Sequence, residues 1–532
     1  MNILKNIIQK VPKHLWILLA IFSVGIFLRT YHFRDWLYFY PDQARDVMIT
    51  RDVLNGSEPV PNMGAIAAST NFKIGPMYYY FQIVSGKIFG VAPETMAYPD
   101  LFFSILTIPL FYFFLKRYFS QGISLSLTGL FSVSFFAIKY SRFAWNSNPT
   151  PFFVLLFLMS LLEFLDNKEK TSWKWMAGAG IALGVGIQLH TTLFVLLPPI
   201  ALLVFVYLII KDRNIWKNGI CVLLIALALN AVPLIHEIST NFHNTRILYN
   251  VSTEGSQHKS TFLDSLKMNT LCHIQANSYI VSSLGDKEDC NFLNILRRQV
   301  WSIDMDKKPL EEILLSIIFS VLGYAALVCY FFLEKESRKK NFLGLILLFI
   351  FLSYLIFFTV ADSLLLRYFI NLIFVPFLFL GFFIKLLQKC YRIIFWPITV
   401  FLFLFLALTN VSTLTSEAKT HFAKDRSDPM YVVLGEIEPM RDYMISQSGS
   451  HREAYFYAEG KYMQNYFKPM FYISSEKNFI ILRAKSPDEA PAGELLFFIG
   501  ASSEYDNSGY LNGRMIVNYK NFGQIGVYEL EN

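Results

Sequence analysis

Eleven strongly apolar segments, separated mostly by short polar loops, dominate this chain. A transmembrane helix needs about 20 mostly apolar residues, and somewhat fewer when flanking side chains reach the interface. Only 16% of the residues are charged, against roughly 25% in ordinary soluble chains. The sequence therefore predicts an α-helical polytopic membrane protein with about 11 transmembrane helices. The predicted spans are residues 14–30, 97–115, 121–138, 150–165, 173–189, 192–210, 218–235, 311–333, 342–360, 368–387 and 393–410.

Positive charge lies mainly on one side of these segments. The loops on the side of the N-terminus carry about 18 lysines and arginines, whereas the short loops on the other side carry only Lys139, Arg142 and Arg367. The positive-inside rule then predicts a multi-pass protein of the cell (plasma) membrane with a cytoplasmic N-terminus. The net charge of +7 follows from these loops, so no nucleic-acid partner is predicted.

Residues 74–89 are apolar enough to be counted as a further span. Counting them would reverse the side of every later loop and remove the charge asymmetry. We therefore expect this segment to lie along the outer interface of the membrane, where Gly75, Pro76 and the tyrosines at 78–80 fit an amphipathic helix at headgroup depth. The alternative is a twelfth transmembrane helix.

This topology divides the chain into two domains. Residues 1–410 are expected to form the transmembrane domain, with a first outer loop at 31–96 and a second at 236–310. Residues 411–532 are expected to form a small extracytoplasmic α/β domain. Its predicted elements are a helix over 430–446 and strands over 453–457, 479–482, 494–500 and 523–530.

Two of the five cysteines, Cys272 and Cys290, lie in the second outer loop. An oxidising exterior favours a disulfide between them. Two free thiols are the alternative. No spacing of cysteine and histidine resembles a zinc site.

The first outer loop holds the densest group of ionisable residues. Asp42 and Asp46 are four residues apart, so on a helix they share a face, and Arg45 lies between them. Asp42 follows an aromatic stretch, residues 36–40, and Pro41. This context suggests a partly desolvated carboxylate suited to act as a general base. The alternative is a solvated helix on the membrane surface, held by salt bridges.

The order of the outer motifs resembles that of bacterial GT-C membrane glycosyltransferases. The closer similarity is to the protein-mannosyltransferase-like group, which includes lipid A aminoarabinose transferases (glycosyltransferase family 39 or 83 type). It covers roughly residues 14–390, and each motif alone is weak. The motifs are Asp42-Gln-Ala-Arg-Asp46, Val53-Leu-Asn-Gly56, Gly75-Pro-Met-Tyr-Tyr-Tyr80, Ser141-Arg-Phe-Ala-Trp-Asn-Ser-Asn-Pro149, Gln188-Leu-His-Thr-Thr192 and Arg367-Tyr368.

The resemblance implies a polyprenyl-phosphate-linked sugar donor, an inverting transfer and a lipid, glycan or protein acceptor outside the cytoplasm. It implies that Asp42 is the base that deprotonates the acceptor hydroxyl. Lys73, Arg142 and Arg367 would bind the donor phosphate, although both arginines have an alternative role as interfacial anchors. The implied substrate contacts are Asp46, Tyr78, Tyr79, Asn146, His190 and Tyr368.

Some of these residues also have structural interpretations. Asn146 is suited to cap the following helix, and His190 to form a hydrogen bond between helices. Many GT-C members have Asp-Glu where this chain has Asp42-Gln43, so the second carboxylate of a metal site is missing there. Asp46 is the carboxylate that would substitute for it if a divalent metal binds, so metal dependence stays open. No other cofactor is predicted.

Two other function classes compete with glycosyl transfer. A transporter or flippase of lipid-linked or envelope components would carry ionisable residues or broken helices near the bilayer midplane. The midspan positions of this chain are overwhelmingly apolar. A non-catalytic assembly or receptor protein would leave the charged cluster of the first loop without a purpose. Glycosyl transfer is the favoured interpretation.

Overall fold

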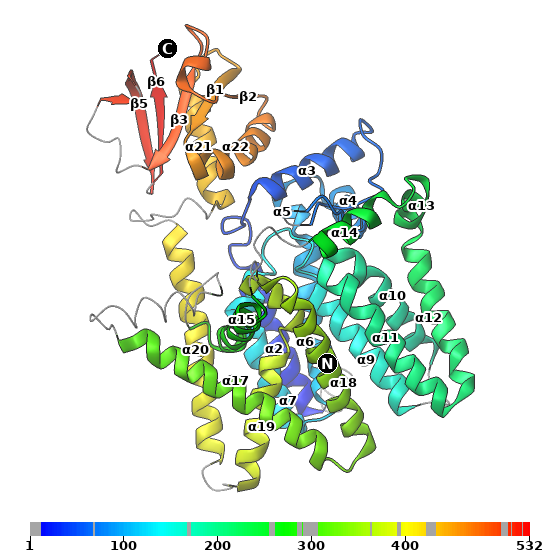
Figure 1. Cartoon of the computed structure of the whole chain (residues 1–532). Helices are drawn as coiled ribbons and strands as arrows, with labels where there is room; N and C mark the ends of the chain where they lie inside the picture. Colours follow the sequence, from blue (N-terminus) through cyan, green and yellow to red (C-terminus); the bar gives the residue numbers. More distant parts are fainter. Residues whose placement is uncertain are drawn as a thin grey trace, which may run out of the picture.

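The computed structural model describes residues 12–67, 70–167, 172–254, 261–284, 290, 307–361, 364–390, 395–421, 432–501, 509–511, 513–523 and 525–531. Helices form the body of the molecule, and a small sheet domain lies beyond one end of it (Figure 1). This is the arrangement that the sequence predicts.

Each of the eleven predicted spans coincides with one helix or with two successive helices. Six described helices are long and apolar enough to cross a membrane. They are α2 (Lys13–Thr30), α6 (Tyr98–Leu115), α11 (Thr191–Lys211), α17 (Lys307–Leu333), α18 (Ser337–Phe358) and α20 (Phe395–His421). Two further pairs, α12 (Trp216–Leu229) with α13 (Ala231–Ser239) and η3 (Leu366–Leu372) with α19 (Val375–Cys390), pass the same test but are bent by 66° and 61°, which gives up to eight spans.

The other helices of the body are shorter, so the count of eleven spans stays a prediction. They are α7 (Gln121–Val133), α8 (Phe135–Lys139), α9 (Thr150–Asp166), α10 (Trp173–Leu189), η1 (Arg213–Ile215), α12 (Trp216–Leu229), α13 (Ala231–Ser239), η3 (Leu366–Leu372) and α19 (Val375–Cys390).

The predicted span at 121–138 is broken between α7 and α8, and neighbouring helices satisfy the freed polar groups. The Phe135 backbone N–H donates to Oδ1 of Asn410 (2.7 Å), and the Ser134 hydroxyl donates to the Ile280 carbonyl (2.8 Å). Backbone at membrane depth needs such internal partners. The break between α7 and α8 is thus stabilised by contacts with other helices. After α8 the chain enters the segment 140–149 beside the candidate site.

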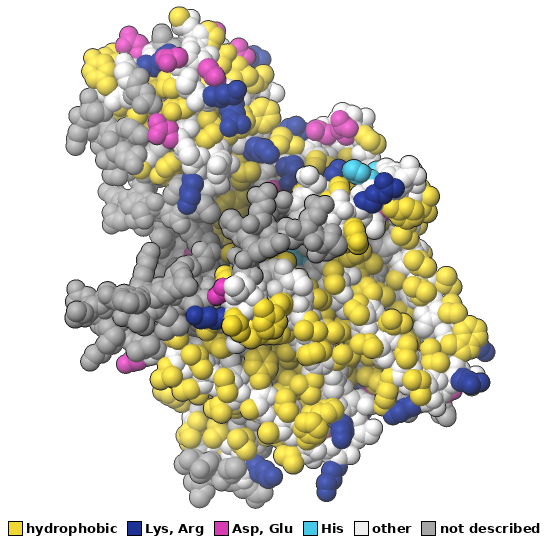
Figure 2. All heavy atoms as spheres, in the orientation of Figure 1, with side chains coloured by type: hydrophobic (Ala, Val, Ile, Leu, Met, Phe, Trp, Pro, Cys, Tyr) yellow, Lys and Arg dark blue, Asp and Glu magenta, His cyan; other side chains and the backbone are white. Residues whose placement is uncertain are grey.

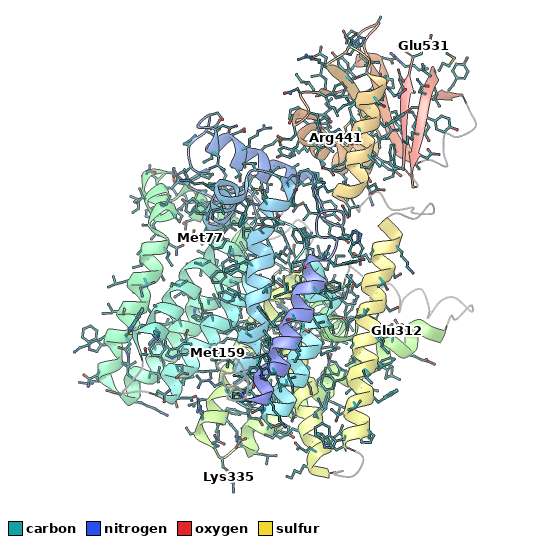
Figure 3. The ribbon with its side chains drawn as sticks, turned by 180° about the vertical axis from the view of Figure 1, so that it is seen from behind. Met77, Met159, Glu312, Lys335, Arg441 and Glu531 are labelled. Carbon is teal, nitrogen blue, oxygen red and sulfur yellow. A yellow bond between two sulfur atoms is a disulfide. The ribbon has the colours of Figure 1, made fainter. Side chains whose placement is uncertain are left out.

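The surface of the helical body fits a lipid environment. Figure 2 shows hydrophobic side chains over much of its visible face, with lysines and arginines along the lower edge. Leu202, Ile210 and Phe401 are examples of large apolar side chains of the body that are mostly exposed. Seen from behind, Lys335 lies at the end of the body opposite to Met77 and Arg441 (Figure 3). The chain is a multi-pass membrane protein.

The first outer loop folds into three helices above the body: α3 (Pro41–Leu54), α4 (Met77–Phe89) and α5 (Pro93–Met96). Helix α4 has 13 residues, fewer than the about 20 that a span needs. It lies beside α3, so closely that a Cβ on Gly86 would be 3.2 Å from Thr50 Cγ2. The short length of α4 agrees with an interfacial segment rather than a twelfth span.

The second predicted outer loop, residues 236–310, contains helices that the sequence did not predict. It contains α14 (His243–Glu254) and α15 (Phe262–Ser282), and α15 packs against α17, α18, α19 and α20. The polar residues of α15 had argued against a helix packed in the core. In the structure these side chains have partners on other helices: Asn277 donates to Ser320 Oγ (3.3 Å) and Tyr324 Oη (3.2 Å). Cys272 of α15 forms a disulfide with Cys290.

The C-terminal domain is a six-stranded sheet with two helices on one face. The strand order is β2-β1-β3-β6-β5-β4, with β1 parallel to β2 and β3 and the other pairs antiparallel. The elements are α21 (Leu434–Gln447), β1 (Glu453–Ala458), α22 (Gly460–Ser475), β2 (Ile480–Arg483), η4 (Pro487–Glu489), β3 (Leu496–Ala501), β4 (Tyr510–Leu511), β5 (Arg514–Phe522) and β6 (Ile525–Leu530).

The predicted helix and all four predicted strands of this domain are present, whereas α22, β4 and β5 were missed. Helix α20 continues to residue 421, so the first residues of the predicted tail extend the last helix of the body.

The C-terminal domain is fastened to the first outer loop. Tyr38 and Val433 form an antiparallel bridge. Arg34 forms a two-pronged ion pair with Glu438, with N···O distances of 2.9 and 2.6 Å. Buried side chains of both segments also form one continuous apolar cluster. The helix that carries Asp42 is therefore held between the membrane body and the C-terminal domain.

Candidate functional site

Helix α3 starts where the sequence favours a helix start, because Pro41 occupies its first position. The Gln43 side chain closes the first turn: its oxygen accepts from the Tyr40 backbone N–H (3.0 Å). Its amide donates to the Ala144 carbonyl (2.6 Å). Gln43 thus fixes the start of α3 against the segment 140–149, a structural role that its position after Asp42 did not reveal.

Asp42 points away from the protein at the first turn of α3. Its side chain is 68% exposed, and its Oδ1 accepts a hydrogen bond from Arg45 Nη1 at 2.8 Å. The expectation of a partly desolvated Asp42 was therefore wrong. The preceding aromatic stretch packs Leu37 and Phe39 into the core, while the second helical position of Asp42 projects its carboxylate outward.

Asp46 is the buried carboxylate of the pair. Its Oδ1 accepts from Arg45 Nε (2.9 Å) and from the Tyr79 hydroxyl (3.2 Å). Burial raises the pKa of Asp46 from 3.8 to about 6, although the charge of Arg45 opposes this shift. Burial and the negative charge of Asp46 likewise raise the pKa of Tyr79. Arg45 joins both carboxylates into one unit.

We expect Asp46 to make stability depend on pH. Because its folded pKa lies above its unfolded value, the folded state keeps a proton between about pH 4 and 6 that the unfolded state has lost. The free energy of unfolding should therefore fall as pH rises through this window, by on the order of 3 kcal/mol. Thermal unfolding of wild type and Asp46→Asn from pH 4 to 7 measures this. Parallel pH curves for the two proteins would contradict it.

Beneath the start of α3 lies an aromatic platform of five side chains, Tyr38, Tyr40, Tyr140, Phe143 and Trp145. Tyr38 stacks on Tyr40, with ring centroids 5.6 Å apart and planes at 8°. Phe143 stacks on Trp145 at 6.2 Å and 14°, and the edge-to-face pair of Tyr38 and Phe143 (5.6 Å) links the two stacks. The platform runs from the residue just before α3 to Trp145.

Arg367 borders the other end of this platform. Its guanidinium carbon lies 5.6 Å from the ring centroids of both Trp145 and Tyr368. It is exposed and forms no ion pair with a carboxylate among the residues that the structure describes. A guanidinium without an acidic partner can bind an anion in bidentate fashion.

His190 lies beside Tyr368, with ring centroids 5.9 Å apart. Its Nδ1 accepts from the Thr192 backbone N–H (3.1 Å), which caps α11. Burial, and then the charge of Arg367, lower the pKa of His190 to about 4, so the ring is neutral at pH 7. The Asn146 amide donates to the Leu189 carbonyl, which ties the platform segment to the same corner. Asn146 therefore does not cap α9.

Lys73 approaches the same corner between α10 and α11 from the first loop. A Cβ on Gly75 would lie 2.3 Å from Gln188 Cγ, so a side chain there would collide and glycine is required. The Lys73 backbone N–H donates to Asn244 Oδ1 of α14 (2.7 Å). Its side chain is exposed, and within the described ranges its ammonium forms no ion pair.

Two predicted site residues are occupied by structural contacts instead. Arg142 is buried and donates to the carbonyls at the end of α2, those of Leu28, Arg29, Tyr31 and His32. The buried Tyr78 hydroxyl donates to Asp100 Oδ2 (2.8 Å). Arg142 and Tyr78 thus bind other parts of the protein, whereas the side chains of Arg367 and Lys73 are exposed.

Arg142→Ala should destabilise the protein rather than weaken substrate binding selectively. Four backbone carbonyls would lose a buried charged donor, which costs on the order of 3 kcal/mol. Fluorescence-detected size-exclusion chromatography after heating checks this, with Arg367→Ala as a matched arginine control whose unfolding midpoint stays unchanged. A midpoint for Arg142→Ala equal to that of wild type would contradict the structural role.

Three buried or partly buried ionisable residues near the platform, Lys139, Glu417 and Asp100, were not among the predicted site residues. Lys139 Nζ lies 3.4 Å from Glu417 Oε1 and 5.6 Å from the centroid of Tyr38, and the Tyr38 hydroxyl donates to Glu417. Asp100 accepts from the Trp145 backbone N–H (3.3 Å). The sequence signal for Asp100 was its position as an acidic residue in an apolar helix, which indicates a functional or paired carboxylate. Glu417 lay in the predicted tail, where no such signal marked it.

The carboxylate pair is poorly suited to a metal ion. Asp42 and Asp46 both bind Arg45, whose guanidinium occupies the position between them. No group of three or more His, Cys, Asp or Glu side chains that could hold a metal occurs in the part of the chain that the structure describes.

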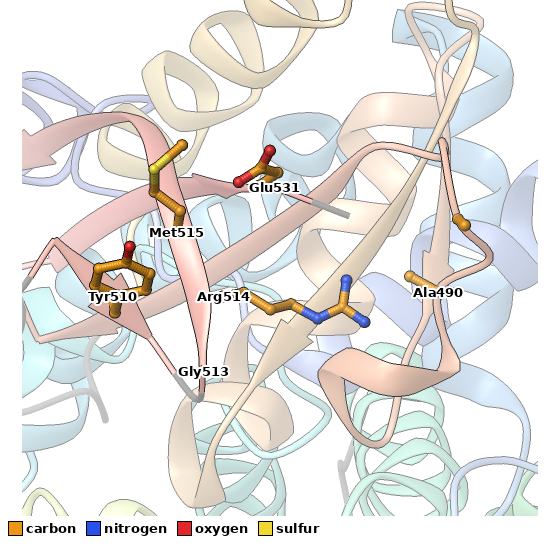
Figure 4. A pocket seen from close by; sticks show the side chains of 7 residues that line it. Ala490, Tyr510, Gly513, Arg514, Met515 and Glu531 are labelled. Atoms are coloured by element: carbon orange, nitrogen blue, oxygen red, sulfur yellow. The ribbon is translucent and has the colours of Figure 1, made fainter.

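A hollow on the C-terminal domain lies apart from this site. It has a volume of about 400 Å³ and is lined by Tyr510, Arg514, Met515 and Glu531, with Ala490 opposite (Figure 4). Asp488 lies 3.4 Å from the Arg514 guanidinium. The hollow is at the β4–β5 edge of the sheet, whereas α3 packs on α22 near β1 and β2.

Residues 73–236 match the family described as dolichyl-phosphate-mannose-protein mannosyltransferase, which agrees with the resemblance of the motifs to the protein-mannosyltransferase-like group. No curated protein sequence matches the chain.

Solved structures of similar arrangement include ArnT from Cupriavidus metallidurans in the apo state (TM-score 0.47, 13% identity) and bound to undecaprenyl phosphate (0.46, 13%), each covering 97% of both chains. The protein O-mannosyltransferase Pmt1–Pmt2 complex of S. cerevisiae bound to the sugar donor covers 44% of this chain and 34% of its own, with a TM-score of 0.35 and 14% identity.

Proposed function

We propose that the protein transfers a sugar, with inversion, from a polyprenyl-phosphate donor to a lipid, glycan or protein acceptor at the membrane face that carries α3. With the N-terminus in the cytoplasm, this face is extracytoplasmic. The arrangement of Asp42 at one end of the aromatic platform and Arg367 at the other carries the proposal. It supplies a base for the acceptor and a cation for the leaving phosphate.

Asp42 is the proposed general base. Its Oδ1 is held by Arg45, while its Oδ2 accepts no hydrogen bond from a residue that the structure describes. That oxygen takes the proton from the acceptor hydroxyl as the hydroxyl oxygen bonds to the anomeric carbon of the sugar. The bond between this carbon and the phosphate oxygen breaks at the same time, and its electron pair leaves with the polyprenyl phosphate. Attack opposite to the phosphate inverts the anomeric carbon.

The leaving phosphate gains negative charge in this step, so fixed cations near it lower the barrier. Arg367 and Lys73 are the proposed cations, because both are exposed and neither has a described acidic partner. Neutral His190 and Tyr368 border Arg367. These two neutral side chains would contact the donor and leave the binding of the phosphate charge to Arg367.

The aromatic platform is the proposed support for the sugar ring. Flat aromatic faces bind apolar C–H faces while the hydroxyl groups stay free for polar contacts. Tyr40 and Trp145 are the partly buried members at its two ends. Asp46 lies one helix turn further along α3, where it binds Arg45 and accepts from the Tyr79 hydroxyl of α4. Both residues would therefore act on the transfer through Arg45 and Asp42.

Lys73→Ala should raise KM for the donor by about tenfold with little change in acceptor KM, because a phosphate contact near the surface contributes about 1–2 kcal/mol. Lys73→Arg keeps the charge and should retain most donor affinity. Lys87→Ala, an exposed lysine on α4, is the matched control. An unaltered donor KM in Lys73→Ala would remove Lys73 from the phosphate site.

Photo-crosslinking tests the donor class directly. Purified protein in lipid nanodiscs is irradiated with a photoactivatable polyprenyl phosphate, and the labelled peptides are identified by mass spectrometry. Label in residues 70–80 and 365–372 that unlabelled polyprenyl phosphate displaces, and that dioleoyl phosphatidic acid does not, supports the proposal. Label spread over the lipid-facing helices without specific displacement would oppose it and favour the transporter class.

A further inference from the structure

A second hollow lies at the other end of the helical body, between α11 and α18. Its volume is about 410 Å³. It is lined by Leu203 and Val204 of α11 and by Gly344, Leu345 and Leu348 of α18. The walls are apolar side chains on two helices that are long and apolar enough to cross the membrane. This end carries Lys335 and is the one opposite to the candidate site (Figure 3).

The mouth of this hollow is positively charged. Lys340 lines it and lies 5.5 Å from the ring centroid of Phe331. Tyr207 lines it as well, and Lys211 donates to the Tyr207 hydroxyl with its ammonium 4.2 Å from the ring centroid. Both ammonium groups lack an ion pair with any carboxylate that the structure describes.

The carboxylate beside the mouth does not neutralise these lysines. Asp166 accepts from Arg117 (2.9 Å), Arg338 (3.1 Å) and the Asn341 amide (3.0 Å). Arg117 also pairs with Glu163, so two arginines balance these two carboxylates. Lys340 and Lys211 remain as uncompensated positive charges at the polar end of an apolar groove.

We propose that this groove binds an anionic phospholipid of the membrane leaflet at the lysine-rich end. One acyl chain would lie between Leu203 and Leu345, and the phosphate would lie between Lys340 and Lys211. The Tyr207 hydroxyl and the Ser337 side chain offer neutral hydrogen bonds at the same level. Charge complementarity selects an anionic headgroup over a zwitterionic one, since each lysine near an anionic lipid contributes about a fivefold gain in affinity.

The proposal is independent of the transfer reaction, because the groove and α3 lie at opposite ends of the body. Lipid binding there would hold the ends of α11 and α18 together and stabilise the fold.

Native mass spectrometry of the purified full chain tests the proposal, with added dioleoyl phosphatidylglycerol or dioleoyl phosphatidylcholine as the probe. We expect the phosphatidylglycerol adduct to be retained at least tenfold better. Lys340→Ala and Lys211→Ala should each reduce its retention about fivefold, and Leu348→Trp should remove the adduct by filling the groove. Lys335→Ala, at the same end but outside the groove, is the matched control and should retain it fully.

Equal retention of the two lipids by wild type would overturn the proposal, and so would equal losses in Lys335→Ala and Lys340→Ala. Where a variant unfolds, the same comparison is made on wild-type protein by the thermal shift that each lipid causes. A larger stabilisation by phosphatidylglycerol supports the site, whereas equal stabilisation opposes it.

Discussion

Asp42→Asn should lower the turnover number of sugar transfer by about 10²–10⁴, the usual contribution of a general base. The amide keeps the size of the side chain and its oxygen can still accept from Arg45, but it cannot take a proton. Because Asp42 is exposed, with 68% of its side chain accessible, the substitution should leave the fold and donor binding unchanged. Transfer kinetics and donor binding on the same preparation separate these effects.

The matched control for Asp42→Asn is Asp52→Asn. Asp52 is a half-exposed carboxylate on the same helix that is also paired with an arginine, Arg51. It lies near the other end of α3, so its loss should not change transfer. Full activity of Asp42→Asn would remove Asp42 as the base and leave Asp46 as the remaining carboxylate of the pair.

Arg367→Ala should give the second largest loss, a decrease of about 10²-fold in kcat/KM for the donor. A charge-assisted contact to the phosphate contributes about 1.5–3 kcal/mol, and it strengthens as the phosphate leaves. Both kcat and KM should therefore change. Arg367→Lys should recover part of the loss, since it restores the charge but not the planar, bidentate geometry.

Arg338→Ala is the control for Arg367→Ala. Arg338 is an exposed arginine at the opposite end of the body, where it pairs with Asp166. Its removal should not change donor kinetics. Equal donor kcat/KM in wild type and Arg367→Ala would show that Arg367 serves only as an anchor on Trp145 and Tyr368.

Apolar length and charge asymmetry predicted most of the helical body, because lipid leaves a chain few other ways to satisfy its backbone. The same signals failed for α15. Its polar residues, such as Asn269 and Asn277, made residues 262–282 look like a surface loop. Their hydrogen bonds are to groups on other helices, for example from Asn269 to the Tyr354 carbonyl (3.0 Å), and such long-range partners are absent from local sequence.

The candidate site was predictable as a region but less so residue by residue. The spacing of Asp42, Arg45 and Asp46 placed them on one face of a helix, as found. Which carboxylate is buried depends on Tyr79 and on the C-terminal domain packed against α3, neither of which local spacing reveals. Arg142 and Arg367 looked equivalent in sequence, yet one caps α2 and the other is exposed beside Trp145.

The role of the last helix was also hidden from sequence. Glu417 and Lys139 are separated by 278 positions, yet their side chains lie 3.4 Å apart beneath Tyr38. Helix α20 thus contributes to the support of the aromatic platform just before the chain enters the C-terminal domain. A predicted span that ended at residue 410 could not indicate this contact.

The proposed reaction moves a sugar from a polyprenyl phosphate by means of Asp42. The most direct test uses a panel of radiolabelled polyprenyl-phosphate sugars with purified protein in membranes, wild type beside Asp42→Asn. We expect wild type to transfer or release label from one member of the panel and Asp42→Asn to bind that donor without turnover. Folded wild-type protein that neither binds nor turns over any member would contradict the proposed function.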